Sequence, residues 1–320
     1  MKKLWQLGLT AILSVFLLTA CGGTATLEKP KVDETPKVEI VTPAFPITLT
    51  DAVGKEITIE TAPATIVSMM PSNTEILFEL GLASEIIGVN DFDDYPAEAL
   101  EKEKIGGMKF NVEKIVSLNP EIVFAHESAL PAGEAGLQQI RDAGIPVFVV
   151  KNAASFEETY KTIEEMGKAT GKTEQAEKIV TDMKAKVAEV LAKTAKVENK
   201  KTVFVEIQDA PDIHTTGKGT FMQEILDMIG ANNIVTEEGW VKIDPEKIVS
   251  ANPDVIVVMY SYVPDIIESV KKRAGFDSIT AVKEDAVVQV DENLTNRTGP
   301  RLAQGLEEVA KAIYPEAFSE

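Results

Sequence analysis

The two histidines of the chain are the first residues to test for chemistry, because imidazole is a common general base and metal ligand. His126 and His214 stand in different halves of the sequence, and neither belongs to a nucleophile elbow or a metal-protease motif. A metal site needs three or four nitrogen, sulfur or carboxylate ligands. A hydrolase needs a nucleophile beside a base that a third group orients. The sequence therefore predicts no catalytic residue, no bound metal, no cofactor and no enzyme activity.

A second group of residues suits binding, because aromatic and polar side chains follow buried, β-branched runs. Ligands of open parallel sheets bind beyond the carboxyl ends of the strands. In the first half these positions hold Pro71, Ser72, Asp91, Phe92, Asp94, Tyr95, Met108, Phe110 and His126. In the second half they hold Gln208, Asp209, Trp240, Tyr260, Tyr262, Asn293 and Arg297. Aromatic rings with a few polar groups suit a large, flat, partly apolar ligand.

The elements that must position these residues are short apolar strands that alternate with helical stretches. Continuous rather than alternating hydrophobicity predicts strands buried on both faces, in mainly parallel sheets that helices cover. The expected strands are 66–69, 86–89, 122–125, 147–150, 203–207, 255–259 and 287–290. Ser72 with Glu75, and Ser155 with Glu158, predict capping boxes at two helix starts.

The sequence contains an internal duplication. EKIVSLNP at 113–120 recurs as EKIVSANP at 246–253, and EILFELG at 75–81 is echoed by EILDMIG at 224–230. Asn111 and Asp244 are suitable N-caps, Pro245 suits a first helical position, and each Asn-Pro ends its helix. The pattern predicts two similar Rossmann-like α/β lobes, each with one short helix that leads into a core strand.

Between the two lobes, the stretch from Thr173 to about Val197 lacks glycine and proline and repeats apolar residues at three- and four-residue spacing. Gly171 separates it from the preceding helix. One helix of ~25 residues would be roughly 37 Å long. We expect this helix to act as a rigid spine that limits the relative motion of the lobes.

The N-terminus has the features of an export signal. Lys2 and Lys3 precede an apolar run that ends in Leu18-Thr19-Ala20-Cys21, and this pattern resembles a bacterial lipobox. The expected organisation is a signal peptide at 1–20, a lipid-anchored tether at 21–45, an N-terminal lobe at 46–154, a helical region at 155–198 and a C-terminal lobe at 199–320. A net charge of −19 argues against nucleic acid as a partner.

These features together resemble a solute-binding lipoprotein of an ABC importer, in the class with one rigid connecting helix. The resemblance covers residues 46–320 and rests on PSNTEILFELG, DYP at 94–96, the two EKIVS turns, GW at 239–240 and NRTGPRL at 296–302. It implies two lobes with a ligand cleft between them. Members of this class capture cobalamin, iron-siderophores or heme, and DYP and the Trp240 segment are most similar to cobalamin receptors.

The resemblance implies several roles. The transported ligand is expected to be a corrinoid, with an iron-siderophore or heme as the alternative within the class and an extracellular hydrolase as the alternative outside it. The expected ligand-binding residues are Tyr95, Phe110, Trp240, Tyr260, Asn293 and Arg297. Arg301 is expected at the surface or in a helix. Gly107 stands where cobalamin receptors place a second tryptophan, and Met108 or Phe110 is expected to take the place of that ring.

Further expectations concern the metal of the ligand and the partners of the chain. His126, Tyr260 and Tyr262 are the residues that heme would use as an axial ligand. Anionic catecholate siderophores are disfavoured because the expected binding loops hold few arginines and lysines. Glu113 and Glu246, one from each EKIVS turn, are expected to dock on the ABC permease and its ATPase complex. A lipid on Cys21 would hold the protein at the outer face of the cytoplasmic membrane.

Overall fold

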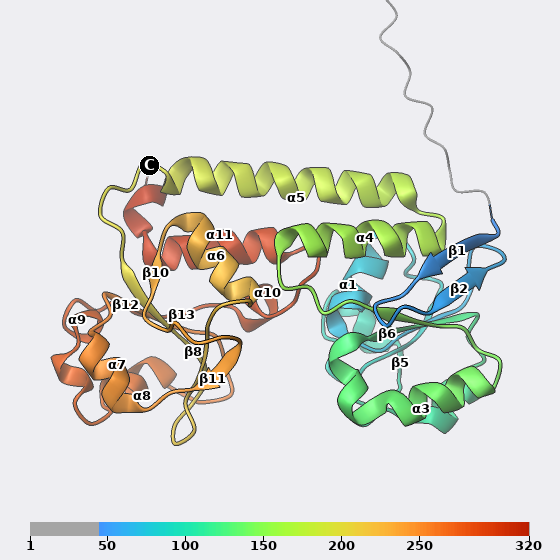
Figure 1. Cartoon of the computed structure of the whole chain (residues 1–320), viewed down its shortest axis with the longest axis horizontal. Helices are drawn as coiled ribbons and strands as arrows, with labels where there is room; N and C mark the ends of the chain where they lie inside the picture. The colour runs from blue at the N-terminus through green and yellow to red at the C-terminus, as the bar shows by residue number, and fades with distance from the viewer. Residues whose placement is uncertain (1–44, 320) are drawn as a thin grey trace, which may run out of the picture. The chain divides into compact units, whose positions relative to one another are not determined.

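The computed structural model describes residues 45–319. The expected signal peptide, Cys21 and nearly all of the expected tether lie outside these residues. Within the described part of the chain, no helix has the length and apolar character needed to cross a membrane. An antiparallel hairpin of β1 (Ile47–Thr50) and β2 (Glu56–Ile59) precedes the first sheet (Figure 1).

The N-terminal lobe contains a five-stranded sheet in the order β5-β4-β3-β6-β7, and every neighbouring pair is parallel. Its strands are β3 (Ile66–Ser68), β4 (Ile86–Val89), β5 (Glu103–Lys104), β6 (Ile122–His126) and β7 (Val147–Val150). Its helices are α1 (Pro71–Glu79), α2 (Val112–Leu118) and α3 (Leu130–Asp142), with short 3₁₀ turns η1 (Ala97–Glu101) and η2 (Glu127–Ala129). The apolar runs therefore form the parallel sheet that the sequence predicts.

The C-terminal lobe contains a six-stranded mixed sheet in the order β11-β9-β8-β12-β13, with β10 also paired to β8. The parallel pairs join β8 to β10 and β12, and β12 to β13, whereas β9 is antiparallel to both of its neighbours. The strands are β8 (Thr202–Gln208), β9 (His214–Thr216), β10 (Asn232–Asn233), β11 (Trp240–Lys242), β12 (Val255–Val258) and β13 (Val287–Gln289). Trp240 thus begins an edge strand.

The helices of this lobe follow the same alternation. They are α6 (Phe221–Ile229), α7 (Pro245–Ala251), α8 (Ile266–Lys271), α9 (Thr280–Lys283), α10 (Glu292–Thr295) and α11 (Leu302–Ile313). Short 3₁₀ turns lie at η3 (Phe276–Ser278) and η4 (Pro315–Phe318). The fold of the described chain is mixed α/β, with two lobes of similar construction.

The helix that the sequence predicts between the lobes is α5 (Thr173–Thr194), and it ends three residues earlier than expected. It follows α4 (Phe156–Thr170), which ends at Gly171 in the left-handed region at φ 72°. The helix α5 packs against both α4 and α11 (Figure 1).

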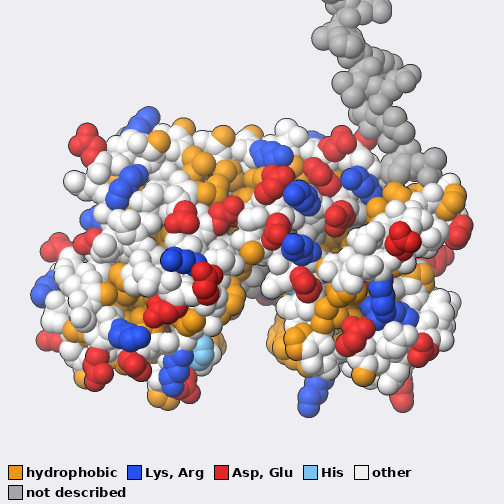
Figure 2. Space-filling view, in the orientation of Figure 1, with side chains coloured by type: hydrophobic (Ala, Val, Ile, Leu, Met, Phe, Trp, Pro, Cys, Tyr) orange, Lys and Arg blue, Asp and Glu red, His pale blue; other side chains and the backbone are white. Residues whose placement is uncertain are grey.

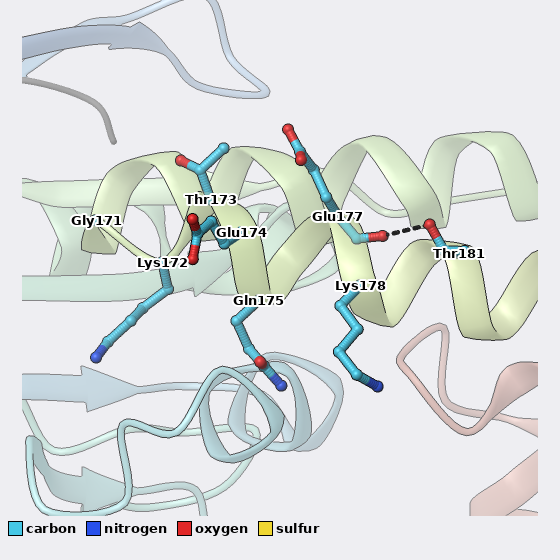
Figure 3. A pocket seen from close by; sticks show the side chains of 8 residues that line it. All are labelled: Gly171, Lys172, Thr173, Glu174, Gln175, Glu177, Lys178 and Thr181. Atoms are coloured by element: carbon cyan, nitrogen blue, oxygen red, sulfur yellow. Dashed lines mark hydrogen bonds between the residues drawn. The ribbon is translucent and has the colours of Figure 1, made fainter. Parts of the chain in front are cut away.

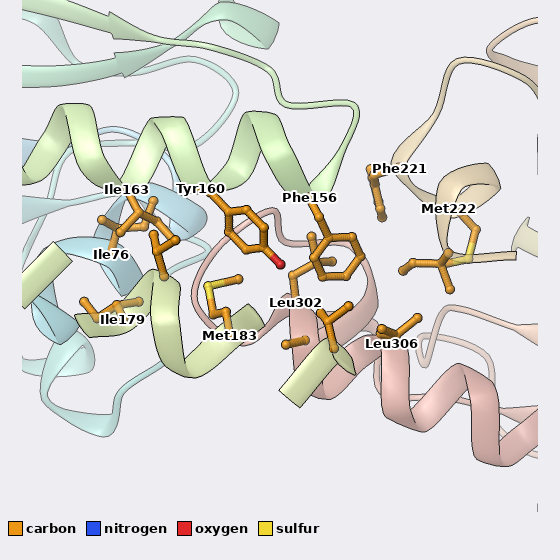
Figure 4. Close-up of a cluster of buried hydrophobic side chains, with 14 of the residues drawn as sticks. Ile76, Phe156, Tyr160, Ile163, Ile179, Met183, Phe221, Met222, Leu302 and Leu306 are labelled. Atoms are coloured by element: carbon orange, nitrogen blue, oxygen red, sulfur yellow. The ribbon is translucent and has the colours of Figure 1, made fainter. Parts of the chain in front are cut away.

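One hydrophobic cluster continues from the N-terminal lobe through these helices into the C-terminal lobe. Figure 4 shows its middle part, where the side chains come from α1, α4, α5, α6 and α11. Those that the figure labels are Ile76, Phe156, Tyr160, Ile163, Ile179, Met183, Phe221, Met222, Leu302 and Leu306. Because the cluster is shared, relative motion of the two lobes would have to disturb buried apolar contacts.

The helix caps test the local part of the sequence prediction. Asn111 caps α2 by accepting from the Lys114 N–H, and Ser155 caps α4 by accepting from the Glu158 N–H. The predicted capping box at Ser72 is wrong, because α1 begins earlier, at Pro71, with Ser72 inside the helix. Asp244 occupies the N-cap position of α7, but its side chain makes no capping hydrogen bond.

Candidate functional site

Exposed large apolar side chains concentrate in loops beyond the strands. In the N-terminal lobe, Phe92 and Tyr95 follow β4 and Met108 follows β5. In the C-terminal lobe, Tyr262 follows β12 and Trp240 begins β11. Their exposed fractions run from 38% for Tyr95 to 76% for Met108. Figure 2 shows hydrophobic side chains on both sides of the hollow that separates the lobes.

The aromatic residues of the C-terminal lobe are supported by neighbouring rings. The Trp240 ring packs against that of Phe221, with ring centroids 5.6 Å apart. Tyr262 stacks on Tyr260 at 4.9 Å, and its hydroxyl accepts from the Asp209 N–H. Ring-on-ring contact restricts the motion of an exposed aromatic side chain, so it can meet a ligand at a lower entropic cost.

A cluster of two arginines and two acids joins the lobes. The Glu75 carboxylate of α1 is buried and accepts from Arg297 at 2.9 Å and from Arg301 at 2.7 and 2.9 Å. Arg297 also donates to Asp94 at 2.7 Å, and the Arg301 guanidinium lies 3.7 Å from the centre of the Tyr95 ring. We call Glu75, Asp94, Arg297 and Arg301 the interlobe cluster. Its hydrogen bonds are charge-assisted, and Arg301 engages Glu75 with two nitrogens.

A similar arrangement lies inside the C-terminal lobe. Arg273 donates to both oxygens of the fully buried Glu206, at 2.6 and 2.7 Å, and to Asp209 at 2.6 Å. Tyr260 is also buried, and its hydroxyl donates to Glu206. Burial and the nearby Glu206 raise the pKa of Tyr260 above its ordinary value. This phenol is therefore held as a neutral donor within the lobe.

Asp93, which precedes Asp94 of the interlobe cluster, carries a buried carboxyl group. Asp93 accepts from the Thr74 hydroxyl at 3.1 Å through one oxygen, whereas its other oxygen has no hydrogen-bond partner among the described residues. Loss of solvent raises the pKa of Asp93 to about 7, against the weaker opposing effects of Thr74 and Asn90. The Lys104 ammonium donates to the Asp93 backbone carbonyl at 2.9 Å.

Neither histidine is placed as a metal ligand. His126 is buried at the end of β6, its Nδ1 lies 2.8 Å from the Ser128 hydroxyl, and burial lowers its pKa to about 4. His214 Nδ1 lies 2.8 Å from the Asp212 carbonyl oxygen. Within residues 45–319 no group of three or more histidine, cysteine or acidic side chains is arranged to hold a metal ion.

The residues selected from the sequence fall into two groups. Tyr95, Asn293 and Arg297 come together, since the Asn293 amide also donates to Asp94 at 3.3 Å. Trp240 is exposed in the C-terminal lobe. The structure places Phe110 and Tyr260 differently, as residues that pack within their own lobes.

Phe110 packs on α3, where two glycines leave room for its ring. A Cβ atom on Gly133 or Gly136 would lie 2.8 Å from the Phe110 ring. In the same way, a Cβ atom on Gly107 would lie 2.9 Å from the ring of Phe92. Phe92 and Met108 therefore present the apolar surface at this edge, rather than Phe110.

The sequence does not identify two members of the interlobe cluster, Glu75 and Arg301. Arg301 was expected at the surface or in a helix, but its side chain is 12% exposed and pairs with Glu75. Glu75 was expected to cap α1, but its carboxylate binds arginines of the other lobe. No local sequence signal identifies this role of Glu75, because the burial of the first seven residues of α1 is seen only in the fold.

One pocket on the described surface lies away from these residues. It is lined by Gly171, Lys172 and the first turns of α5 as far as Thr181 (Figure 3). Figure 3 shows polar and charged side chains around it, with no aromatic ring among those that line it. A pocket formed along one helix offers little apolar surface to a large flat ligand.

Comparison with known proteins identifies the family. The periplasmic binding protein family model matches residues 66–294, which include both sheets and α5. The chain belongs to this family. It is similar along its whole length to an uncharacterized ABC transporter substrate-binding lipoprotein, YvrC, of Bacillus subtilis strain 168, with 42% identity over 323 residues and 100% of each chain covered.

Two further relatives indicate the range of this periplasmic binding protein family. A cobalamin-binding protein of Halobacterium salinarum is 26% identical over 284 residues, covering 85% of this chain and 75% of its own. The crystal structure of a possible iron-binding (periplasmic solute-binding) protein from Staphylococcus epidermidis is 36% identical, with a TM-score of 0.73. That match covers 79% of this chain and all of the other. The chain is thus an ABC transporter substrate-binding protein of the cobalamin, heme and siderophore class.

The repeated EKIVS segment forms equivalent helices in this periplasmic binding protein. Glu113 lies in the first turn of α2 and Glu246 in the first turn of α7, and both are exposed. Each helix ends at an asparagine in the left-handed region, Asn119 at φ 49° and Asn252 at φ 47°. Among the described residues, neither glutamate forms an ion pair, so both carboxylates are available to a partner.

Proposed function

We propose that this substrate-binding protein captures a corrinoid and delivers it to an ABC permease. The observation that carries the proposal is a set of exposed, apolar side chains on both lobes. Phe92, Tyr95, Met108 and Tyr262 lie in loops that follow strands, and Trp240 begins the edge strand β11. A corrin ring is broad and partly apolar, and rings that meet its faces would bury a large area. The similarity to a cobalamin-binding protein over 85% of the chain supports the same ligand class.

The charges around these residues also favour a corrinoid. Three of the four arginines of the chain, Arg273, Arg297 and Arg301, form ion pairs with buried glutamates. These guanidinium groups are therefore already satisfied, whereas a catecholate siderophore would need unpaired cations. The amide side chains of a corrinoid are uncharged, so such a ligand needs no unpaired cation.

Heme is the second candidate, and Tyr262 favours it. This phenol is 63% exposed and stacked on Tyr260, so it could approach an iron atom. His126 and Tyr260, the other two residues considered for that role, are buried and hydrogen-bonded. Replacing Tyr262 by phenylalanine would weaken heme binding and change its absorption spectrum, whereas binding of cyanocobalamin, whose cobalt carries its own ligands, would change little.

The proposed location and partners follow from the same role. A lipid on Cys21 would anchor the protein at the outer face of the cytoplasmic membrane, and 21–45 would act as a tether. The exposed Glu113 and Glu246 would each meet one subunit of a permease that has two-fold symmetry. We assign no enzyme activity to the chain. Turnover of ester or phosphoester substrates that is lost on His126→Ala would contradict this assignment.

The deciding experiment is a calorimetric titration of residues 46–320, which comprise both lobes and the helices between them, with cyanocobalamin, cobinamide, hemin and a set of ferric siderophores. The proposal predicts saturable, one-to-one binding of at least one corrinoid that is tighter than binding of hemin or any siderophore. Preference for hemin would favour the second candidate. Preference for a ferric siderophore would refute the corrinoid proposal.

A further inference from the structure

The interlobe cluster is electrically neutral because of one exposed residue, Asp94. The formal charges of Glu75 and Asp94 balance those of Arg297 and Arg301. The Glu75 side chain is 1% exposed and both arginine side chains are 12% exposed, whereas that of Asp94 is 49% exposed. A ligand that approaches the cluster therefore meets a carboxylate before it meets a guanidinium.

The hydrogen bonds of Arg297 show why this carboxylate matters. One terminal nitrogen of Arg297 donates to Glu75 at 2.9 Å and to Asp94 at 2.7 Å, so both of its hydrogens are in use. The other terminal nitrogen donates to the Phe92 carbonyl at 3.4 Å. An anionic group of a ligand could reach the first nitrogen only by displacing Asp94, and would then bring its own charge close to Glu75.

The surroundings hold Asp94 in this position. Its second oxygen accepts from the Asn293 amide at 3.3 Å, so residues of the C-terminal lobe bind both oxygens. It lies beside Tyr95, whose exposed ring is packed against Arg301. The neighbouring Asp93 is buried, and the exposed Asp91 accepts from the Gly106 N–H at 3.1 Å, so the exposed carboxylate that contacts Arg297 is that of Asp94.

From this arrangement we infer that Asp94 is a specificity-determining residue, which makes the edge of the ligand site accept neutral, amide-bearing ligands and reject carboxylate-bearing ones. The inference rests on the proposed function, and it specifies the charge of the ligand groups that can lie next to Asp94. Its physical cause is discrimination by like charge: an anionic ligand is repelled by Asp94 and is denied the guanidinium that Asp94 occupies.

A pair of ligands with the same ring tests the inference. Dicyanocobinamide carries amide side chains, whereas dicyanocobyrinic acid carries carboxylic acids on the same corrin. The wild-type protein should bind the amide form at least about tenfold more tightly, because each anionic group that nears Asp94 is repelled. Asp94→Asn keeps the size and an acceptor oxygen for Arg297 but leaves the cluster with one excess positive charge. In this variant the preference for the amide over the acid should fall about tenfold relative to wild type, because the acid is no longer repelled at this edge.

The matched control is Glu98→Gln, which removes the same charge from an exposed residue of the turn η1, four positions along the chain. Its ratio of the two affinities should equal that of wild type, which separates a local effect from a change in net charge. The change of preference in Asp94→Asn should also shrink as salt is raised, since ions screen exposed charges. Equal ratios in wild type and Asp94→Asn, or equal shifts in both variants, would overturn the role of Asp94.

Failure of the corrinoid proposal gives a different result, in which wild-type protein binds neither corrinoid. The role of Asp94 is then tested with hemin and its uncharged dimethyl ester, which differ in the same way. Tighter binding of hemin by Asp94→Asn, without a matching change for the ester, supports the discrimination. Equal effects on both, or no binding of either by any variant, refutes it.

Discussion

At the scale of single residues, this protein separates exposed rings from buried charges. Trp240 and Tyr262 are exposed but packed on neighbouring rings, whereas Glu75 and Glu206 are buried and held by arginines. Each kind of residue depends on its support. An unsupported ring would lose more entropy on binding a ligand, and an unpaired buried carboxylate would be strongly destabilising.

Trp240 provides a direct test of the ligand site. It is the single tryptophan of residues 45–319, and its ring is 46% exposed. If a strongly absorbing corrin stacks on it, saturating ligand should quench most of the tryptophan emission. Trp240→Ala should weaken binding by about 1–3 kcal/mol, as expected for an aromatic hot spot. Val53→Ala, at an exposed apolar residue between β1 and β2, is the control and should leave affinity unchanged. Unchanged emission at saturation would remove Trp240 from the site.

Asp93 should make stability depend on pH. Its pKa is about 7 in the folded protein because of burial, and 3.8 is its ordinary value. Between these two values the folded state binds more protons than the unfolded state, so this group lowers stability as pH rises from about 4 to about 7. Asp93→Asn removes the cost of ionisation.

The measurement is urea denaturation of Asp93→Asn and wild type at pH 5 and pH 8. The free energy of unfolding of the variant, relative to wild type, should be higher at pH 8 than at pH 5. Asp277→Asn, at an exposed aspartate of η3, should show no such difference. A relative stability of Asp93→Asn that does not change with pH would show that Asp93 ionises normally.

At the scale of elements, the duplicated helices α1 and α6 each use one glutamate to reach across the molecule. Glu75 of α1 binds Arg297 and Arg301, which both precede α11. Glu224 of α6 stands at the matching position of the second EIL segment and accepts from the Phe156 N–H, at the start of α4, at 2.6 Å. Each copy of the repeated segment thus supplies a glutamate that binds an element outside its own lobe.

Removing the Glu75 carboxylate should reveal how much the interlobe cluster depends on it. Glu75→Ala leaves two largely buried guanidinium groups without their main acceptor, and breaking a buried pair costs about 3–5 kcal/mol. The free energy of unfolding should fall by this amount in chemical denaturation. Glu79→Ala, at the exposed end of the same helix, should change it by less than about 0.5 kcal/mol. Equal effects of the two substitutions would mean that the cluster contributes nothing specific.

At the scale of the whole molecule, two lobes present the same exposed acid from the same kind of turn. An acid in the first turn of a helix is favoured locally by roughly 0.3–1 kcal/mol, which explains Glu113 and Glu246 one at a time. It does not explain why both stay exposed and unpaired within the described chain. A partner with two equivalent basic pockets would explain the pair.

Reversing both charges, in Glu113→Lys with Glu246→Lys, should therefore abolish ligand uptake by cells. Ligand affinity and melting temperature should stay nearly unchanged, because neither side chain packs in the core. The matched control reverses the exposed Glu60 and Glu284 instead, which changes the net charge equally. Normal uptake by the Glu113 and Glu246 variant, or loss of its ligand binding, would contradict the docking role.

The sequence by itself determined the elements and the repeat. Continuous β-branched runs gave the core strands, Asn111 and Ser155 gave helix starts, and Gly171 gave the break before α5. These features depend on the preferences of neighbouring residues, which a single sequence displays. The same applies to the exposed aromatic residues in loops after the strands, because the position of a strand end indicates where its loop must lie.

Only the tertiary structure decided which of these residues are free to meet a ligand. Tyr260 follows a strand like Tyr262, but it turns inward to Glu206, which lies 54 positions away in the chain. Glu75 meets Arg297 across 222 positions, and Asp94 meets it across 203. Side-chain direction and pairing over such separations are set by how the two lobes pack, so local sequence patterns cannot specify them. The neutral interlobe cluster, and with it the proposed role of Asp94, exists only in the folded chain.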